Sequence, residues 1–194
     1  MENELFQFIS QYITLTDDEI SAITELDLFR HYNKESILLR EGDISDKYYF
    51  VLKGCIRSYY IIDGNEKTTN FYTEYESFSP PCVVSKTPSK HYIACVEDCI
   101  LSVATPMMEQ NIFTKFPRFE SLCRIMSEEI SAKQQLASDH FKNFAPEQRY
   151  LHLLESRPDL TKRVPQYQIA SYLGMTPESL SRIRKRIKVN NKQS

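Results

Sequence analysis

The sequence predicts an α+β protein in which an antiparallel β sandwich or barrel precedes a long helix and a basic helical segment. Short β-rich runs recur about every ten residues from position 37 to 104, apolar residues then follow steps of four and three, and residues 141–194 combine helix caps with cationic side chains. The 194 residues allow one large domain or two small ones. Apolar residues make up 41% and charged residues 26%, which excludes a disordered chain or a fibrous rod.

The first 30 residues are predicted to be helical, because Thr16 and Glu19 have the spacing of a capping box ahead of an apolar stripe. Glycine-containing turn signals separate the β-rich runs that follow, which is typical of antiparallel strands. These runs are Ile37–Leu39, Tyr48–Leu52, Cys55–Ile62, Thr68–Tyr72, His91–Val96 and Ile100–Ala104. Ser77–Lys90 contains three prolines and no alternation, so we expect a long irregular loop there, and such loops often have a function.

A long helix is predicted after Pro117, which can occupy a first helical position. Its apolar residues form a heptad-like seam with a polar interruption at Lys133. The seam consists of Phe119, Cys123, Met126, Ile130 and Ala137. The helix either packs on its own domain or pairs with its twin in a dimer. We favour the dimer, because the helix joins a β domain to a basic domain.

The charge is distributed unevenly along the chain. Residues 141–194 contain eleven Lys and Arg residues and four Asp and Glu residues. Residues 1–140 contain thirteen Lys and Arg residues and twenty-two Asp and Glu residues. An acidic body followed by a basic segment indicates that only the second part meets a polyanion, the alternative being a solvated basic helix without a partner.

The basic segment is predicted to hold three helices. The first begins at Pro146 and ends at Arg157, and the second begins near Pro165 and ends at Gly174, in the left-handed conformation that glycine favours. Thr176 can cap the third helix. On this third helix Leu180, Ile183 and Ile187 point inward, Ser179, Arg182 and Arg186 point outward, and Arg184, Lys185 and Lys188 flank the outer face. A helix, a turn with glycine and a second helix with a cationic outer face indicate a helix-turn-helix that enters the major groove of DNA.

The chain resembles the CRP/FNR family of bacterial transcription regulators over nearly all its length. In the β-rich part, the motifs that resemble the family are Glu41-Gly42-Asp43 and the run from Tyr49 to Gly54. In the basic segment, they are Ile169-Ala170, Leu173-Gly174 and the run from Thr176 to Arg182. It implies a jelly-roll (double-stranded β-helix) sensor domain in residues 1–115, a dimerisation helix in 116–142 and a helix-turn-helix DNA-binding domain in 143–194.

The resemblance also implies a homodimer that acts on palindromic double-stranded DNA, with RNA polymerase as a further partner. We expect the DNA contacts to come from both helices of the motif and from the end of the second one. The expected residues are Gln166, Tyr167, Thr176, Glu178, Ser179, Arg182, Lys185, Arg186 and Lys188.

Three departures from the family pattern limit the resemblance. The cyclic-nucleotide readers hold the ribose and phosphate with a Gly-Glu pair and an Arg, neither of which stands between Phe78 and His91 here, so cAMP or cGMP is not expected. The N-terminal cysteine cluster of the oxygen sensors is missing, which argues against an iron–sulfur cluster. Only seven residues follow Ile187, so we expect the β-hairpin wing after the recognition helix to be reduced. In addition, Pro177 replaces an Arg found in many members.

The candidate effector pocket consists of Tyr72, Phe78, Ser79, Cys82, Ser89 and Lys90.

Other functions are less well supported by the sequence. The four histidines have no close ligand spacing, and no nucleophile–base motif or phosphate loop is present, so we expect no metal, no resident cofactor and no enzymatic activity. An acidic N-terminus, the lack of a long apolar run and five scattered cysteines predict a cytoplasmic protein that does not enter a membrane. A sensor of the same fold that does not read DNA, and a jelly-roll enzyme, remain the alternatives.

Overall fold

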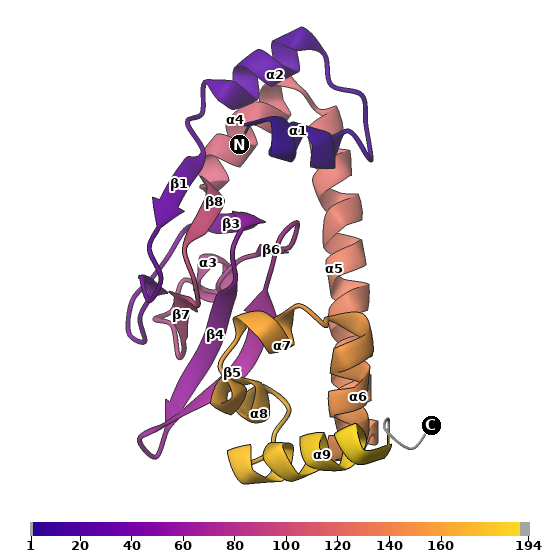
Figure 1. Ribbon diagram of the computed structural model, residues 1–194. Helices are drawn as coiled ribbons and strands as arrows, with labels where there is room; N and C mark the ends of the chain where they lie inside the picture. Colours follow the sequence, from indigo (N-terminus) through magenta and orange to yellow (C-terminus); the bar gives the residue numbers. More distant parts are fainter. Residues whose placement is uncertain (1, 191–194) are drawn as a thin grey trace. The chain divides into compact units, whose positions relative to one another are not determined.

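The computed structural model describes residues 2–190, which fold into two compact units. Of the described residues, unit 1 contains those up to 57 together with 71–132, and unit 2 contains 58–70 together with those from 133 on. Strands β4 and β5 and helix α5 run from one unit into the other (Figure 1). None of the described helices combines the length with the apolar character needed to cross a bilayer.

The β domain consists of two four-stranded sheets, with strand orders β1-β8-β3-β6 and β2-β7-β4-β5. The strands are β1 (Phe29–Tyr32), β2 (Ile37–Leu39), β3 (Tyr48–Lys53), β4 (Ile56–Ile62), β5 (Asn65–Tyr72), β6 (Ser77–Phe78), β7 (Tyr92–Cys95) and β8 (Cys99–Ala104). Strand β8 pairs antiparallel with both β1 and β3. The predicted antiparallel β architecture is therefore confirmed.

The core of the β domain is apolar and closely packed. Val51, Ile56 and Leu101 are fully buried in it, because alternate side chains of their strands point inward. The turn between β3 and β4 needs glycine at position 54, where φ is +106° and a Cβ atom would lie 2.5 Å from the Cys99 Sγ atom.

Several elements differ from the sequence prediction. The helical assignment of the first 30 residues is wrong at its end, since β1 begins at Phe29. The loop expected over Ser77–Lys90 contains the short strand β6 and one helical turn, α3 (Cys82–Ser85). A two-residue strand and a single turn are too short to produce a recognisable periodicity. Helix α4 (Pro106–Lys115) was also not predicted, although Thr105 caps it and Pro106 occupies its first turn.

The N-terminal helices α1 (Glu2–Ile9) and α2 (Asp17–Thr24) pack with the start of α5 (Arg118–Asn143) around a second apolar cluster in unit 1. The predicted capping box is present, with Thr16 and Glu19 bonded to each other in both directions.

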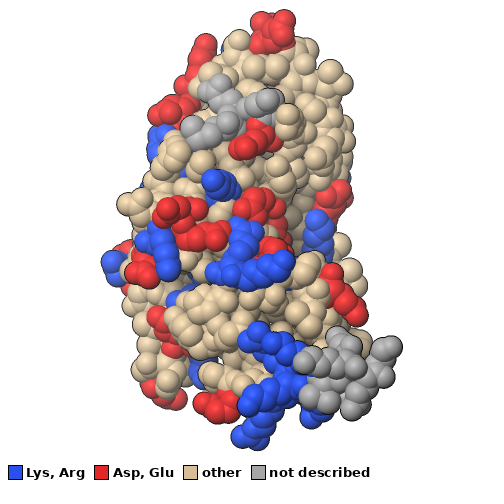
Figure 2. All heavy atoms as spheres, in the orientation of Figure 1, with Lys and Arg blue, Asp and Glu red and all other residues tan. Residues whose placement is uncertain are grey.

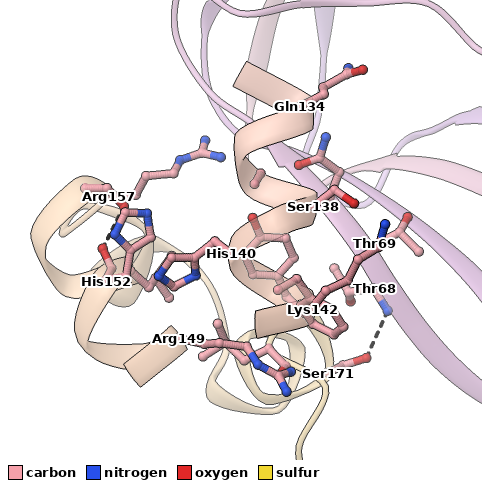
Figure 3. Close-up of a pocket in the computed structure, with 17 residues that line it drawn as sticks. Thr68, Thr69, Gln134, Ser138, His140, Lys142, Arg149, His152, Arg157 and Ser171 are labelled. Atoms are coloured by element: carbon pink, nitrogen blue, oxygen red, sulfur yellow. Dashed lines mark hydrogen bonds between the residues drawn. The ribbon is translucent and has the colours of Figure 1, made fainter. Parts of the chain in front are cut away.

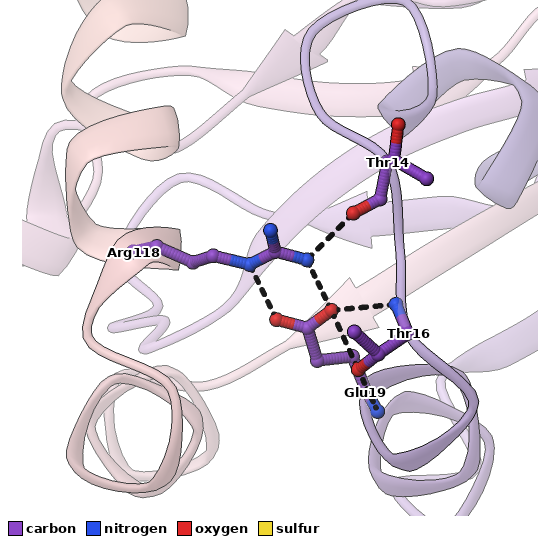
Figure 4. Close-up of polar contacts among 4 residues, drawn as sticks. All are labelled: Thr14, Thr16, Glu19 and Arg118. Carbon is purple, nitrogen blue, oxygen red and sulfur yellow. Dashed lines mark hydrogen bonds and ion pairs between the residues drawn. The ribbon is translucent and has the colours of Figure 1, made fainter.

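The buried Glu19 carboxylate also accepts a hydrogen bond from the Arg118 Nε atom at 2.5 Å and pairs with the second guanidinium arm (Figure 4). That arm also donates to the Thr14 carbonyl at 2.6 Å. These bonds, chiefly those from Arg118, lower the pKa of Glu19 to about 2.

Unit 2 contains the β4–β5 hairpin residues and the C-terminal helices. These helices are α6 (Pro146–Ser156), α7 (Leu160–Arg163), α8 (Gln166–Tyr172) and α9 (Pro177–Asn190). The predicted boundaries at Pro146 and Gly174 are confirmed, and Gly174 has a φ of +68°. The short helix α7 was not predicted. Its residue Leu160 is fully buried with Ile169 and Leu180. Residues 188–190 continue α9, and residues 191–194, on which the expected reduced wing also depends, lie outside the described part of the chain.

Candidate nucleic-acid interface and effector pockets

The α8–α9 pair is built by local signals in the sequence. The Met175 N–H donates to the Ala170 carbonyl at 3.0 Å across Gly174, which ends α8. The Thr176 Oγ1 atom then accepts a hydrogen bond from the Ser179 N–H at 3.2 Å and begins α9. Leu180 and Ile183 are buried, so one side of α9 is fixed against the helical core of unit 2.

The opposite side of α9 presents exposed cations. Arg182, Lys185 and Lys188 are exposed, and no described carboxylate forms an ion pair with any of them. Figure 2 shows lysine and arginine side chains gathered over α9. The pKa of Glu178 is lowered, first by its own backbone N–H and then by Thr176 and Arg182, so its carboxylate is ionised beside the cationic face. This face can contact a polyanion without first breaking an internal ion pair.

Arg186 is arranged differently from the other predicted contacts. Its Nε atom donates to Glu147 Oε1 at 3.0 Å and its second arm donates to Glu147 Oε2 at 2.5 Å. Glu147 belongs to the first turn of α6, 39 residues away in the sequence. A helical repeat indicates which side of α9 a residue occupies, but it does not identify a partner on another helix.

The remaining predicted contacts are partly engaged within the chain. The Ser179 hydroxyl accepts a hydrogen bond from Thr176 Oγ1 at 3.2 Å. Gln166 is half-buried, and its Nε2 atom donates to the Thr161 carbonyl at 3.5 Å. Tyr167 is exposed, and its hydroxyl accepts a hydrogen bond from Gln168. Tyr167 is therefore more accessible to a partner than Gln166.

The six residues of the predicted effector pocket differ in how deeply they are buried. Phe78 is buried and stacks on Tyr49 at 5.0 Å and on Tyr72 at 4.3 Å between ring centroids. Cys82 is buried in the same core, and its thiol contacts the Ser45 backbone. Phe78 and Cys82 thus belong to the buried core of the β domain, and the half-buried Tyr72 packs against that core.

The polar residues of that set differ in their exposure to solvent. Ser89 is buried, and its hydroxyl donates to the His91 carbonyl at 2.8 Å, whereas Ser79 and Lys90 are exposed. His91 is buried beside Ser89, and burial lowers its pKa. Ser89 and Lys90 are neighbours in the chain, but only Ser89 is buried.

The residues of the predicted dimer seam on α5 also differ in their exposure to solvent. Phe119 is buried in the apolar cluster of unit 1, and Met126 packs against it. Ala137 is exposed, and Cys123 and Ile130 are half-buried. The large exposed apolar side chains of α5 include Ile125 and Leu136. These two are eleven residues apart, which places them on one face of the helix.

Unit 2 contains a cavity of about 460 Å³ that the sequence analysis missed (Figure 3). Its wall comes from β5, the C-terminal part of α5, α6 and α8. His140 of α5 and His152 of α6 stack there with ring centroids 4.0 Å apart. Burial, and then the nearby His152 and Arg149, lower the pKa of His140. No sequence signal could reveal this cavity, because its residues come from four separate segments.

The described residues contain no group of three or more His, Cys, Asp or Glu side chains that could hold a metal ion. The five cysteines all have free thiols.

Comparison with known proteins gives a match for part of the chain and a shared fold. Residues 29–107 match the family described as Cyclic nucleotide-binding domain. No curated protein matches the sequence.

Solved structures of similar fold cover most of the chain. The c-di-GMP responsive global regulator CLP from Xanthomonas campestris is 14% identical, with a TM-score of 0.67, over 88% of this chain and 93% of that one. FixK2 from Bradyrhizobium japonicum is 17% identical, with a TM-score of 0.66, over 84% of this chain and 85% of that one. A CooA mutant from Carboxydothermus hydrogenoformans is 20% identical, with a TM-score of 0.63, over 85% and 78%. The chain is thus structurally similar to regulators of the CRP/FNR family.

Proposed function

We propose that this chain is a DNA-binding transcription regulator, which acts as a homodimer on a palindromic operator and no longer binds cyclic nucleotides. The observation that carries the proposal is the cationic face of α9, where Arg182, Lys185 and Lys188 are exposed on a helix that Leu180 and Ile183 anchor. A helix held in this way can enter the major groove as a rigid element. The fold shared with CLP and FixK2 agrees with this function.

The exposed side chains suit different parts of a DNA site. Arg182 has a planar guanidinium that can donate two hydrogen bonds to a guanine edge, and the ionised Glu178 one turn earlier can accept from a cytosine amino group. Lys185 and Lys188 are point charges that suit phosphates. Two α9 helices about 34 Å apart would read successive major grooves on one side of the duplex.

The homodimer is supported by the exposed apolar face of α5. Leu136 is 70% exposed and Ile125 is 42% exposed. A second copy of α5 would remove both side chains from water. The seam is thereby shifted from Phe119 and Met126, which are covered within the chain, to Ile125 and Leu136.

The loss of cyclic-nucleotide binding is supported by the interior of the β domain. A cyclic phosphate needs a cationic fork and space, whereas Tyr49 and Tyr72 both stack on Phe78 and the stretch from Phe78 to His91 has no Arg. As a regulator of transcription, the protein would act in the cytoplasm with RNA polymerase as a further partner, and its five free thiols agree with that compartment.

The proposal is tested by selecting genomic fragments with the purified protein and measuring their binding in gel shifts at moderate salt. A palindromic fragment that is bound at least about a thousandfold more tightly than random DNA supports it. Equal binding to all fragments contradicts it, and favours a sensor of this fold that does not read DNA sequence. Titration with cAMP and cGMP, followed by calorimetry, is expected to give no heat of binding.

A further inference from the structure

The cavity of unit 2 has a one-sided charge. Its lining contains three cationic side chains and two histidines, but no Asp or Glu; the cations are Lys142, Arg149 and Arg157. Lys142 and Arg149 form no ion pair with any described residue. A cavity with this lining attracts anions and repels cations.

Arg149 is held in place without being neutralised. Its Nε atom donates to the Phe144 carbonyl at 2.9 Å, its Nη1 atom donates to the Leu173 carbonyl at 2.7 Å, and its guanidinium lies 4.2 Å from the Phe141 ring centroid. Backbone carbonyls and a ring restrict the side chain but leave its full positive charge. Arg149 is therefore preorganised for an anionic group, and ligand binding does not cost additional side-chain conformational entropy at this residue.

Thr68 and Ser171 fix the side of the cavity that β5 and α8 form. The Thr68 backbone N–H donates to the Ser171 hydroxyl at 2.9 Å (Figure 3). Both residues line the cavity. The Thr68 Oγ1 atom is covered by protein, so it does not face the space that a ligand would occupy. The hydrogen bond to Ser171 therefore shapes this part of the wall, and the cations alone provide its attraction for an anion.

The rest of the wall favours a flat apolar body. The His140 and His152 rings lie face to face, and Phe141, Leu153 and Leu173 complete the apolar lining. The volume of about 460 Å³ is in the range of pockets for small organic ligands and is much larger than an inorganic ion needs. We propose that this cavity binds a small organic anion, with a flat ring system and one carboxylate or phosphate group directed toward Lys142 and Arg149.

Such a ligand would contact the β5 strand, α5, α6 and α8 at once. It would then stabilise the present arrangement of α8, which precedes α9. The effect on DNA binding rests on the function proposed above, whereas binding of the anion does not. The two proposals therefore fail separately.

The test follows the histidine ring resonances by NMR during titration of the full chain with phenyl phosphate, benzoate, neutral benzamide and inorganic phosphate. His140 and His152 line the cavity, whereas His31 and His91 belong to unit 1 and serve as internal controls. We expect phenyl phosphate or benzoate to shift only the first pair, in a saturable way. Benzamide and inorganic phosphate should bind at least about tenfold more weakly, because each lacks either the charge or the ring. Comparison of the dissociation constants of phenyl phosphate and benzoate shows whether the cavity prefers a phosphate ester or a carboxylate.

Lys142→Gln should weaken the preferred anion about tenfold. Lys162→Gln removes the same charge from an exposed position of unit 2 outside the cavity and should change nothing. The proposal is wrong if no probe shifts the pair, if benzamide binds as tightly as the anions, if all four histidines shift alike, or if Lys142→Gln has no effect. Gel shifts without any probe report on DNA binding alone.

Discussion

Arg186 on α9 and Glu147 at the start of α6 form a two-armed ion pair, with N–O distances of 3.0 and 2.5 Å. The pair joins the C-terminal half of α9 to the first turn of α6. It also occupies one of the exposed cations of α9. If α9 contacts DNA as proposed, Glu147 would limit how many phosphates the protein neutralises.

Glu147→Gln should make DNA binding more salt-dependent. Without the carboxylate, Arg186 becomes free for a phosphate, so the slope of log K against log salt should become steeper by about one. Stability should fall by only about 0.5–1 kcal/mol, because both side chains are substantially exposed. Fluorescence anisotropy over a salt series measures the slope. Glu155→Gln, on an exposed site of the same helix, is the control, and identical slopes for all three proteins would contradict the prediction.

Arg182→Ala should relax the preference for one base pair of each half-site. A lost guanidinium contact to a base edge costs about 1–3 kcal/mol at that position. Lys188→Ala, in contrast, should weaken binding to all sequences alike, because a phosphate contact carries no sequence information. Competition gel shifts with operators changed one base pair at a time distinguish the two. An unchanged preference in Arg182→Ala would show that a different face of α9 reads DNA.

Leu136→Asp should dissociate the homodimer. Placing an unpaired carboxylate in the α5 seam should raise the dimer dissociation constant by at least about tenfold. Sedimentation equilibrium measures this constant. Val84→Asp makes the same change at an 82% exposed position on α3 and should leave the dimer intact. Dimers of equal strength in both variants would place the interface elsewhere.

Glu19 should make the free energy of unfolding depend on pH. Its pKa falls from an ordinary 4.5 to about 2 in the folded protein, so its stabilising contribution is complete above about pH 4.5. That contribution is lost as the pH falls from 4.5 toward 2. Glu19→Gln should cost about 1–2 kcal/mol at neutral pH, a modest value because Arg118 is partly exposed.

Urea unfolding at several pH values measures this contribution, and the difference from the natural protein should shrink toward pH 2. Asp18→Asn removes an exposed carboxylate from the same helix turn and should leave the pH profile unchanged. A constant difference between Glu19→Gln and the natural protein at all pH values would refute the assignment.

Local signals explain why much of the fold could be predicted. Thr16 with Glu19, and Gly174 with Thr176, act within a few residues, so the sequence alone reveals them. Contacts between distant segments follow no such rule. The Glu147–Arg186 pair and the Phe78–Tyr72 stack depend on which elements meet, and the sequence analysis assigned Arg186 and Phe78 to ligands.

The division of the chain into units has a consequence for how the protein matures. Unit 2 joins the hairpin segment of residues 58–70 to helices from the last third of the chain. During synthesis the hairpin leaves the ribosome long before Ser171, whose hydroxyl later bonds to the Thr68 N–H. An N-terminal fragment that ends before α6 would expose that edge, and a C-terminal fragment would lack it. Neither half can therefore be cut out as a contiguous piece that retains all of its native contacts.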